Sequence, residues 1–153
     1  MLEGGITLKR AILCEDNIIL NARFDNKWDA IRACGDTLVK NGYVYKEYVE
    51  RMVDRERGAT VYIGNNLAIP HGTDGSEPYI ITSGISVLQV PDGVQFEDGI
   101  AYILIGIAGR DGEHIKILGS IATVCSDIGN VQKLREAKDK KVICNILEEI
   151  EVI

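Results

Sequence analysis

The chain has 153 residues, of which 46% are hydrophobic and 26% are charged. This length suits one domain with a substantial core, because domains of roughly 100–150 residues are the commonest size. The net charge of -6 argues against non-specific binding to nucleic acid or to an anionic membrane, since both need clustered Lys and Arg. No N-terminal basic region joins a long apolar run, and no apolar run approaches the roughly 20 residues needed to cross a bilayer. We therefore expect a cytoplasmic protein with one domain over residues 1–153.

Two helices are predicted in the first part of the chain. Asp25 or Asn26 offers an N-cap for the first helix, and Asn41-Gly42 supplies its end. Its apolar residues recur at helical spacing, at Trp28, Ile31, Cys34, Leu38 and Val39. A second helix is predicted over 45–57, with one apolar face made of Tyr48, Val49, Met52 and Val53.

Strand-like patterns occupy the middle of the chain and one short segment before it. Residues 17–20 can form a short strand or an extended entry segment, and strands are predicted over 61–63, 67–69, 84–90 and 102–108. The strands 61–63 and 67–69 are expected to form a hairpin around a turn at 64–66, with His71 just past its end. A turn at 91–93 is expected to separate the last two strands. The run 102–108 is nearly all apolar, which is typical of a central strand covered on both faces.

Helical spacing returns after residue 113. One amphipathic helix is indicated by Ile115, Leu118, Ile121, Ala122 and Cys125, and a C-terminal helix by Val142, Ile143, Ile146, Leu147 and Ile150. A short helix over 131–138 is expected between them. Helices and strands thus alternate loosely, which favours an α/β fold with a single domain and a mixed β-sheet flanked by helices on its faces.

The cysteines suggest packing and not chemistry. They are far apart, with no CxxC pair and no close histidine, so neither a zinc site nor a redox motif is indicated. Free cysteine commonly packs as a small hydrophobe. We expect buried structural roles for the four cysteines, which are Cys14, Cys34, Cys125 and Cys144.

The two histidines of the chain lie in informative surroundings. Pro70 biases Ile69 toward extended geometry, so His71 stands where a strand ends. Gly72 has no Cβ, which we expect to let a partner approach the imidazole closely. His114 lies at the start of a helix that follows the apolar strand. The two rings could converge at one edge of the sheet.

On the residues alone, several alternatives stay open for these histidines. Each could be an ordinary solvated or locally hydrogen-bonded side chain, which is the commoner outcome. A metal site is less favoured, because two histidines without a spaced third ligand do not define one. A nucleophile relay between a histidine and Cys125 is the least favoured.

Four segments together carry a family resemblance. They are 48–57, which includes several arginines; 62–73, which contains Ile-Pro-His-Gly; 105–108; and 113–118, which reads Glu-His-Ile-Lys-Ile-Leu. In this order they resemble the enzyme IIA domains of the mannitol and fructose class of the sugar phosphotransferase system. The similarity covers nearly all of the chain, from about 18 to 150. The mannitol branch fits best, because Thr73 follows the glycine and because 62–64 and 89–94 resemble the mannitol pattern.

This resemblance implies a role for three side chains. His71 matches the histidine that is phosphorylated, Arg55 matches the arginine that helps to hold the phosphoryl group, and His114 matches a second histidine that donates a hydrogen bond to it. It implies no metal or organic cofactor. Without the resemblance, a surface ion pair of Arg55 with Asp54 or a neighbouring Glu would be the simpler explanation of that arginine.

The residue types suit phosphoryl transfer. Imidazole, with an ordinary pKa of about 6.5, is a neutral nucleophile near pH 7. The transition state spreads charge over three oxygens, which a guanidinium can contact with forked donors. The resemblance implies the phosphocarrier HPr as donor and an enzyme IIB domain, through its cysteine, as acceptor. We expect Leu67, Ile69 and Ile115 to form a shallow docking face for these partners.

Two other functions share the same residues. A regulatory module could use the same phosphorylation to control a transcription regulator, a transporter or a kinase. A plain binding domain would never be phosphorylated. The sequence therefore predicts a phosphotransferase component for sugar or sugar-alcohol uptake, with a regulatory role as the alternative.

Overall fold

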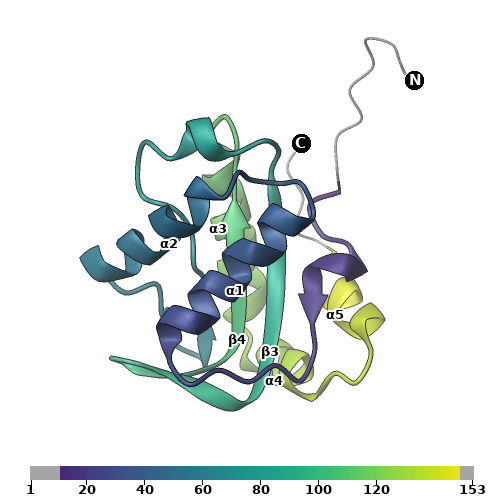
Figure 1. The fold of residues 1–153 in the computed structure, drawn as a ribbon. Helices are drawn as coiled ribbons and strands as arrows, with labels where there is room; N and C mark the ends of the chain where they lie inside the picture. Colours follow the sequence, from purple (N-terminus) through teal and green to yellow (C-terminus); the bar gives the residue numbers. More distant parts are fainter. Residues whose placement is uncertain (1–10, 149–153) are drawn as a thin grey trace.

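The computed structural model describes residues 11–148, and within them four strands form one mixed sheet (Figure 1). The long strands β3 (Gly84–Phe96) and β4 (Gly99–Ala108) pair antiparallel at its centre. The short strands β1 (Ile18–Ile19) and β2 (Leu67–Ala68) pair parallel with β3 and β4 respectively, so the order is β1-β3-β4-β2.

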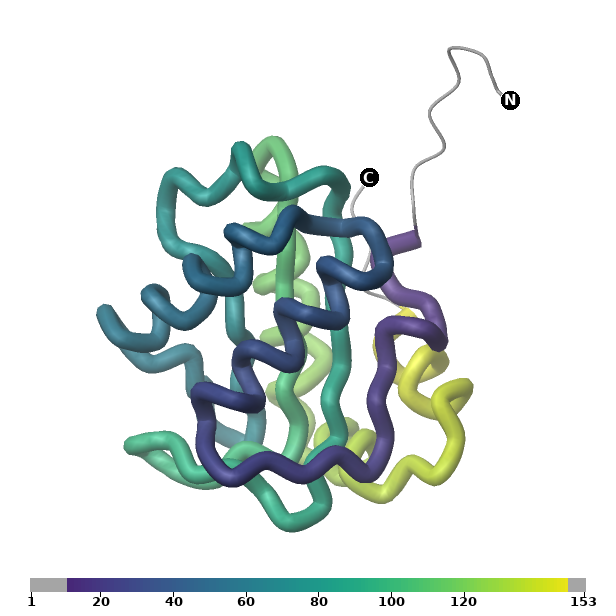
Figure 2. Tube along the Cα trace, viewed as in Figure 1, coloured from purple at the N-terminus to yellow at the C-terminus, as the bar shows by residue number. Residues whose placement is uncertain are grey.

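Helices cover both faces of this sheet. Helices α1 (Lys27–Lys40) and α2 (Glu47–Gly58) pack on one face, and α1 crosses in front of the strands in Figure 1 and Figure 2. The helices α3 (Glu113–Cys125), α4 (Ile128–Glu136) and α5 (Lys140–Leu147) pack on the other face. Two 3₁₀ turns, η1 (Glu15–Asn17) and η2 (Glu77–Tyr79), complete the described elements.

The alternation of side chains along the strands explains the two helix layers. On β4, Ile103, Ile105 and Ile107 pack into the cluster that contains α3, α4 and α5 residues. Leu104 and Ala108, at the intervening positions, pack into the cluster with α1 and α2. A strand that is apolar at every position must be covered on both faces. The predicted α/β fold with a mixed sheet flanked by helices is confirmed.

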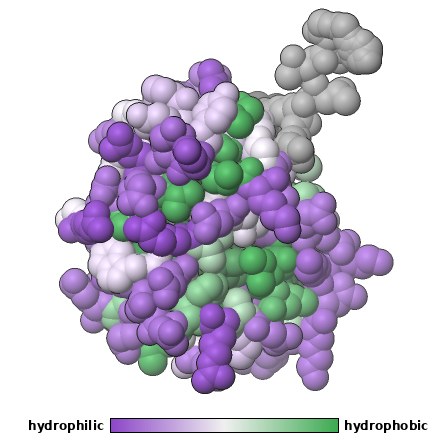
Figure 3. All heavy atoms as spheres, viewed as in Figure 1, coloured by the Kyte–Doolittle hydropathy of each residue, from purple (hydrophilic) through white to green (hydrophobic). Residues whose placement is uncertain are grey.

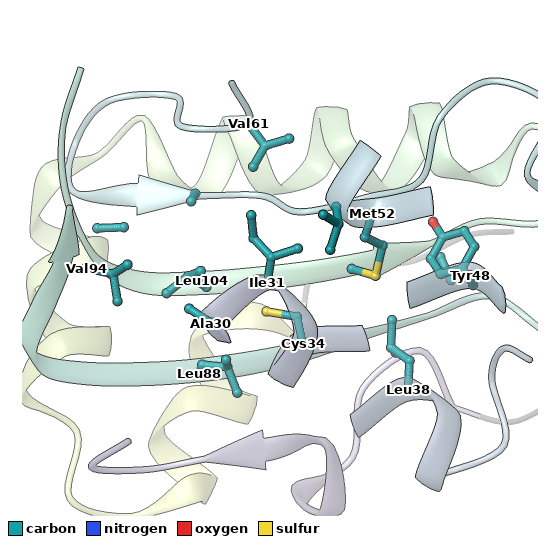
Figure 4. Packing of buried hydrophobic residues seen from close by; sticks show 14 of the residues in the cluster. Ala30, Ile31, Cys34, Leu38, Tyr48, Met52, Val61, Leu88, Val94 and Leu104 are labelled. Carbon is teal, nitrogen blue, oxygen red and sulfur yellow. The ribbon is translucent and has the colours of Figure 1, made fainter. Parts of the chain in front are cut away.

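Helix α1 follows its predicted caps and apolar face. The Asn26 side chain accepts a hydrogen bond from the backbone N–H of Asp29 at 2.9 Å, which is an N-cap. Figure 4 shows Ile31 and Cys34 of α1 among the other buried side chains of this cluster, which include Leu104 and Leu88 of the sheet. The outer face seen in Figure 3 is largely hydrophilic, with hydrophobic side chains showing only in smaller areas.

The predicted turn at 91–93 is wrong. β3 continues through these residues to Phe96, and the chain reverses after it, before Gly99. The register shifts between Gln89 and Val94, and Gly93 has a φ of 79°, so the segment is an irregular stretch within the strand pair. Burial of Val94 and Phe96 in the core favours continued pairing beyond it.

The predicted hairpin of 61–63 with 67–69 is present as an antiparallel bridge between Tyr62 and Ala68. The Ile63 amide donates to the Leu67 carbonyl and the Ile69 amide to the Val61 carbonyl, each at 3.0 Å. The three residues 64–66 have positive φ and form the turn, across which the Leu67 amide donates to the Gly64 carbonyl at 3.0 Å. β2 also pairs with β4 as a parallel edge strand.

Smaller departures concern the helices after β4 and the cysteines. The short helix predicted over 131–138 begins earlier, at Ile128, because Asp127 caps it. Ile150, assigned to the C-terminal helix, lies outside the described residues. Cys34 and Cys125 are buried as expected, but Cys14 and Cys144 are only partly buried.

Gln89 links the sheet to the end of α4. Its Nε2 donates to the backbone carbonyls of Leu134, Arg135 and Ala137 at 3.0, 3.2 and 2.7 Å. Its Oε1 accepts from the Asn21 amide at 3.2 Å. The side chain is buried, so no water can take its place as the hydrogen-bond donor to these carbonyls.

We expect Gln89→Leu to lower the free energy of unfolding by about 3 kcal/mol, because it leaves buried carbonyls without a donor. Chemical denaturation followed by circular dichroism measures this. Gln95→Leu, at an exposed glutamine of the same strand, is the matched control and should change stability by no more than about 0.5 kcal/mol. Equal effects of the two substitutions would show that the buried contacts of Gln89 are unimportant.

Candidate active site

His71 lies three residues past the end of the edge strand β2, where the chain still runs beside β4. The Ile107 amide of β4 donates to the Pro70 carbonyl at 2.8 Å, and His71 forms a parallel bridge with Ile107. Side chains alternate along an extended segment, so His71 shares the sheet face of Leu67 and Ile69. That face is the one that α3 covers. The strand thus directs the imidazole toward the start of α3.

A backbone contact determines which ring nitrogen of His71 is free. Nδ1 lies 2.7 Å from the Ile69 carbonyl oxygen. A carbonyl only accepts hydrogen bonds, so Nδ1 carries the proton in the neutral ring. Nε2 therefore keeps its lone pair. The side chain is half-buried, which leaves this nitrogen accessible.

His114 lies in the first turn of α3, which packs tightly against the end of β4. A Cβ on Gly109 would lie 2.1 Å from the His114 backbone nitrogen, so only glycine allows this approach. Gly112, the residue before the helix, has a φ of 80°, a conformation that also favours glycine. These two glycines bring α3 and its histidine back over the strand end.

Arg55 lies in the last turn of α2. Its Nη1 donates to the Ala59 carbonyl at 2.6 Å, which folds the side chain over the helix end. Asp54 pairs instead with Arg51 and Arg57, at 3.8 and 2.9 Å. Within the described part of the chain Arg55 has no ion pair, so the surface pair considered for it from the sequence is not formed. Its charge remains available to a ligand.

These three side chains line one open pocket of about 390 Å³. Its lining residues come in part from η2 and from the start of α3, two segments that lie at the top of Figure 1. The other residues that line it are Tyr48, Gly72, Thr73, Asp74, Gly75, Ser76, Glu77, Ile80, Gly109, Ile115 and Leu118. Arg55, His71 and His114, far apart in sequence, thus surround a shared space.

The pocket lowers the pKa of His71 below its ordinary value of 6.5. Burial is the main cause, and the positive charges of Arg55 and His114 act in the same direction, while the Ile69 carbonyl and Asp74 oppose them. Because the unfolded chain would take up this proton first, the stability that the neutral ring contributes is present above pH 6.5. It is lost as the pH falls toward the folded-state pKa.

Other kinds of site find little support in residues 11–148. No three His, Cys, Asp or Glu side chains there gather closely enough to hold a metal ion. No helix in that range is long and apolar enough to cross a membrane. Burial raises the pKa of the Cys125 thiol to about 11, which makes a thiolate relay with a histidine unfavourable.

The structure adds a second reason for glycine at position 72. A Cβ there would lie 2.6 Å from the Tyr48 ring, so the missing side chain leaves room for that ring, while Gly72 also lines the open pocket. The Tyr48 hydroxyl accepts from the Gly72 amide at 2.9 Å. Tyr48 was expected only to contribute to an apolar helix face, and no pattern in the sequence indicated its hydroxyl contact.

The expected docking face is only partly correct. Leu67 and Ile69 are buried, because they pack into the cluster that contains α3 residues. Ile115 is 67% exposed. A second hollow adjoins the pocket and shares Arg55 and His71 with it, and its apolar lining includes Ile63, Leu67, Ile69, Leu118 and Ala122.

Comparison with known proteins assigns the chain to a family. The family model described as "Phosphoenolpyruvate-dependent sugar phosphotransferase system, EIIA 2" matches residues 11–150. The chain belongs to this family.

Its relatives include mannitol components. The chain is 48% identical to a mannitol-specific phosphotransferase enzyme IIA component of Geobacillus stearothermophilus, over 91% of this chain and 97% of that protein. It is 39% identical to the component of the same name from Bacillus subtilis, over 91% of this chain and 98% of that protein. Among solved structures, it resembles a chain in a complex of mannitol enzyme IIA and phosphorylated enzyme IIB from Escherichia coli, with a TM-score of 0.84 and 35% identity. The match covers 89% of this chain and 96% of that chain.

We expect the imidazole of His71 to titrate below pH 6.5, with Nδ1 protonated and Nε2 bare in the neutral form. Nitrogen-15 NMR of histidine-labelled protein across pH 5–8 measures both properties. Arg55→Gln should raise the pKa of His71, because it removes one positive charge, whereas Arg57→Gln on the exposed side of α2 should not. A His71 pKa at or above 6.5 in the unmodified chain would contradict the geometry described here.

Proposed function

We propose that the chain is the phosphoryl carrier of a mannitol-type sugar phosphotransferase system. In this function His71 accepts a phosphoryl group from HPr and passes it to an enzyme IIB domain. One observation carries this function: His71 has its Nδ1 bound to the Ile69 carbonyl, and it lines a pocket shared with Arg55 and His114. Residues 1–153 would act as a single EIIA domain.

The proposed reaction has two steps. The Nε2 lone pair of His71 attacks the phosphorus of the phosphorylated donor, a P–N bond forms, and the bond to the donor's imidazole breaks. In the second step a cysteine sulfur of enzyme IIB attacks the same phosphorus and the P–N bond to His71 breaks. The ring begins and ends neutral, with its proton on Nδ1. A low pKa of His71 therefore keeps the nucleophile ready at neutral pH.

The neighbouring side chains would stabilise the transferred group. Arg55 supplies a permanent charge and forked donors to the phosphoryl oxygens, and His114 supplies one further donor. Asp74, which is exposed and lines the same pocket, opposes them by repulsion. This balance would prevent the phosphoryl group from being held too tightly to be passed on.

The names of the relatives support mannitol as the transported sugar alcohol. The Geobacillus and Bacillus proteins and the Escherichia coli structure are all mannitol components, at 35% identity or more. The last of these is bound to phosphorylated enzyme IIB, which supports that kind of domain as acceptor. The regulatory alternative finds no support in these relatives.

We expect His71→Ala protein to acquire no phosphate when it is incubated with phosphoenolpyruvate, enzyme I and HPr. Arg55→Gln should slow phosphoryl acceptance roughly 10²-fold, as for other fixed charges at a transition state. His114→Ala should slow it about tenfold, the value of one hydrogen bond. Intact-protein mass spectrometry against time measures all three rates.

Arg57→Gln is the matched control for Arg55→Gln, because Arg57 lies on the same helix, is exposed and pairs with Asp54. It should transfer at the rate of the unmodified chain. Labelling of His71→Ala at the normal rate would rule out the proposed nucleophile. Failure to label the unmodified chain would favour a plain binding domain.

A further inference from the structure

Tyr48 of α2 connects three parts of the active site. Its side chain is 3% exposed, and its ring fills the space beside Gly72. Figure 4 shows it at one edge of the core cluster, with its hydroxyl oxygen in red. The hydroxyl donates to the Ile107 carbonyl at 2.7 Å and accepts from the Gly72 amide at 2.9 Å. Both residues adjoin His71, one across the bridge and one along the chain.

This hydroxyl occupies the place of a strand hydrogen bond. In a regular parallel pair, the Ile107 amide donates to Pro70 and the Ile107 carbonyl accepts from Gly72. The first bond is present at 2.8 Å. In place of the second bond, the Tyr48 oxygen lies between the Gly72 amide and the Ile107 carbonyl. The edge segment therefore remains tied to β4 at Gly72, but through a side chain of α2.

The same helix carries Arg55, seven residues further on. Residues i and i+7 lie on one face of a helix, two turns apart. A link from Tyr48 to the backbone on either side of His71 therefore fixes α2, and with it the guanidinium, relative to the imidazole. Burial raises the pKa of the Tyr48 phenol to about 12, so it stays protonated and able to donate.

We infer that Tyr48 is a positioning residue for phosphoryl transfer. Through its hydrogen bonds to Gly72 and Ile107, its hydroxyl fixes the position of Arg55 relative to His71. This inference rests on the proposed function of His71. Tyr48 does not itself take or hold the phosphoryl group. Small displacements of reacting groups slow reactions steeply, so loss of this link should act on the rate of transfer.

The test compares Tyr48→Phe with Tyr43→Phe. Tyr43 is also buried, and its hydroxyl donates to the Ala11 carbonyl at 2.7 Å and accepts from Asn17 at 3.0 Å, but it does not line the pocket. Each substitution removes a buried hydroxyl group that donates one hydrogen bond and accepts another. The two variants should therefore lose similar stability.

Rapid mixing with excess phosphorylated HPr measures phosphoryl acceptance by the folded fraction of each variant. Tyr48→Phe should slow the rate constant at saturating HPr roughly tenfold to a hundredfold. Tyr43→Phe should stay within about twofold of the unmodified chain. Nitrogen-15 NMR should show the His71 pKa shifted in Tyr48→Phe and unchanged in Tyr43→Phe.

Equal rates for the two variants, or an unshifted His71 in Tyr48→Phe, would overturn the inference. If the unmodified chain accepts no phosphate, the proposed function fails first, which is a separate result. Should Tyr48→Phe not fold, hydrogen exchange of the unmodified chain decides. The Gly72 amide should be protected relative to the exposed Gly75 amide, and equal exchange would contradict the link.

Discussion

The parallel pairing of β2 with β4 determines where His71 lies. The hydrogen bond from the Ile107 amide to the Pro70 carbonyl keeps the edge segment paired with β4 as far as His71. Because side chains alternate between the two faces of the sheet, the imidazole then lies on the face that α3 covers. The β4 strand that anchors this histidine leads, within a few residues, into the helix that carries His114. One strand pair therefore places both rings, and α2 adds Arg55 from the opposite layer.

Glycine allows this arrangement to close. Gly109 admits the backbone of His114 against the end of β4, and Gly72 admits the Tyr48 ring. Neither contact leaves room for a Cβ, so the pocket depends on glycine at both positions. The result is a half-buried imidazole, which is desolvated enough to stay neutral and open enough to meet a partner. A carrier that both accepts and releases a group needs both properties.

The sequence predicted the helices and the layer order better than the strand ends. Apolar spacing in α1 and unbroken apolarity in β4 depend on burial alone, which a pattern records directly. The irregular pairing at 91–93 and the parallel pairing of β2 with β4 depend on contacts across the sheet, which local residues do not determine. For the pocket, resemblance indicated Arg55, His71 and His114, whereas the hydroxyl contact of Tyr48 needs coordinates, because it joins residues 24 and 59 positions apart.

The nitrogen that bonds to phosphorus is set by the contact of Nδ1 with the Ile69 carbonyl. Protein with nitrogen-15 in its histidines can be phosphorylated through HPr and examined for coupling between phosphorus-31 and each ring nitrogen. This geometry predicts one phosphohistidine, bonded through Nε2 of His71, with Nδ1 still protonated toward the Ile69 carbonyl. Phosphorus on Nδ1 of His71, or on His114, would contradict it.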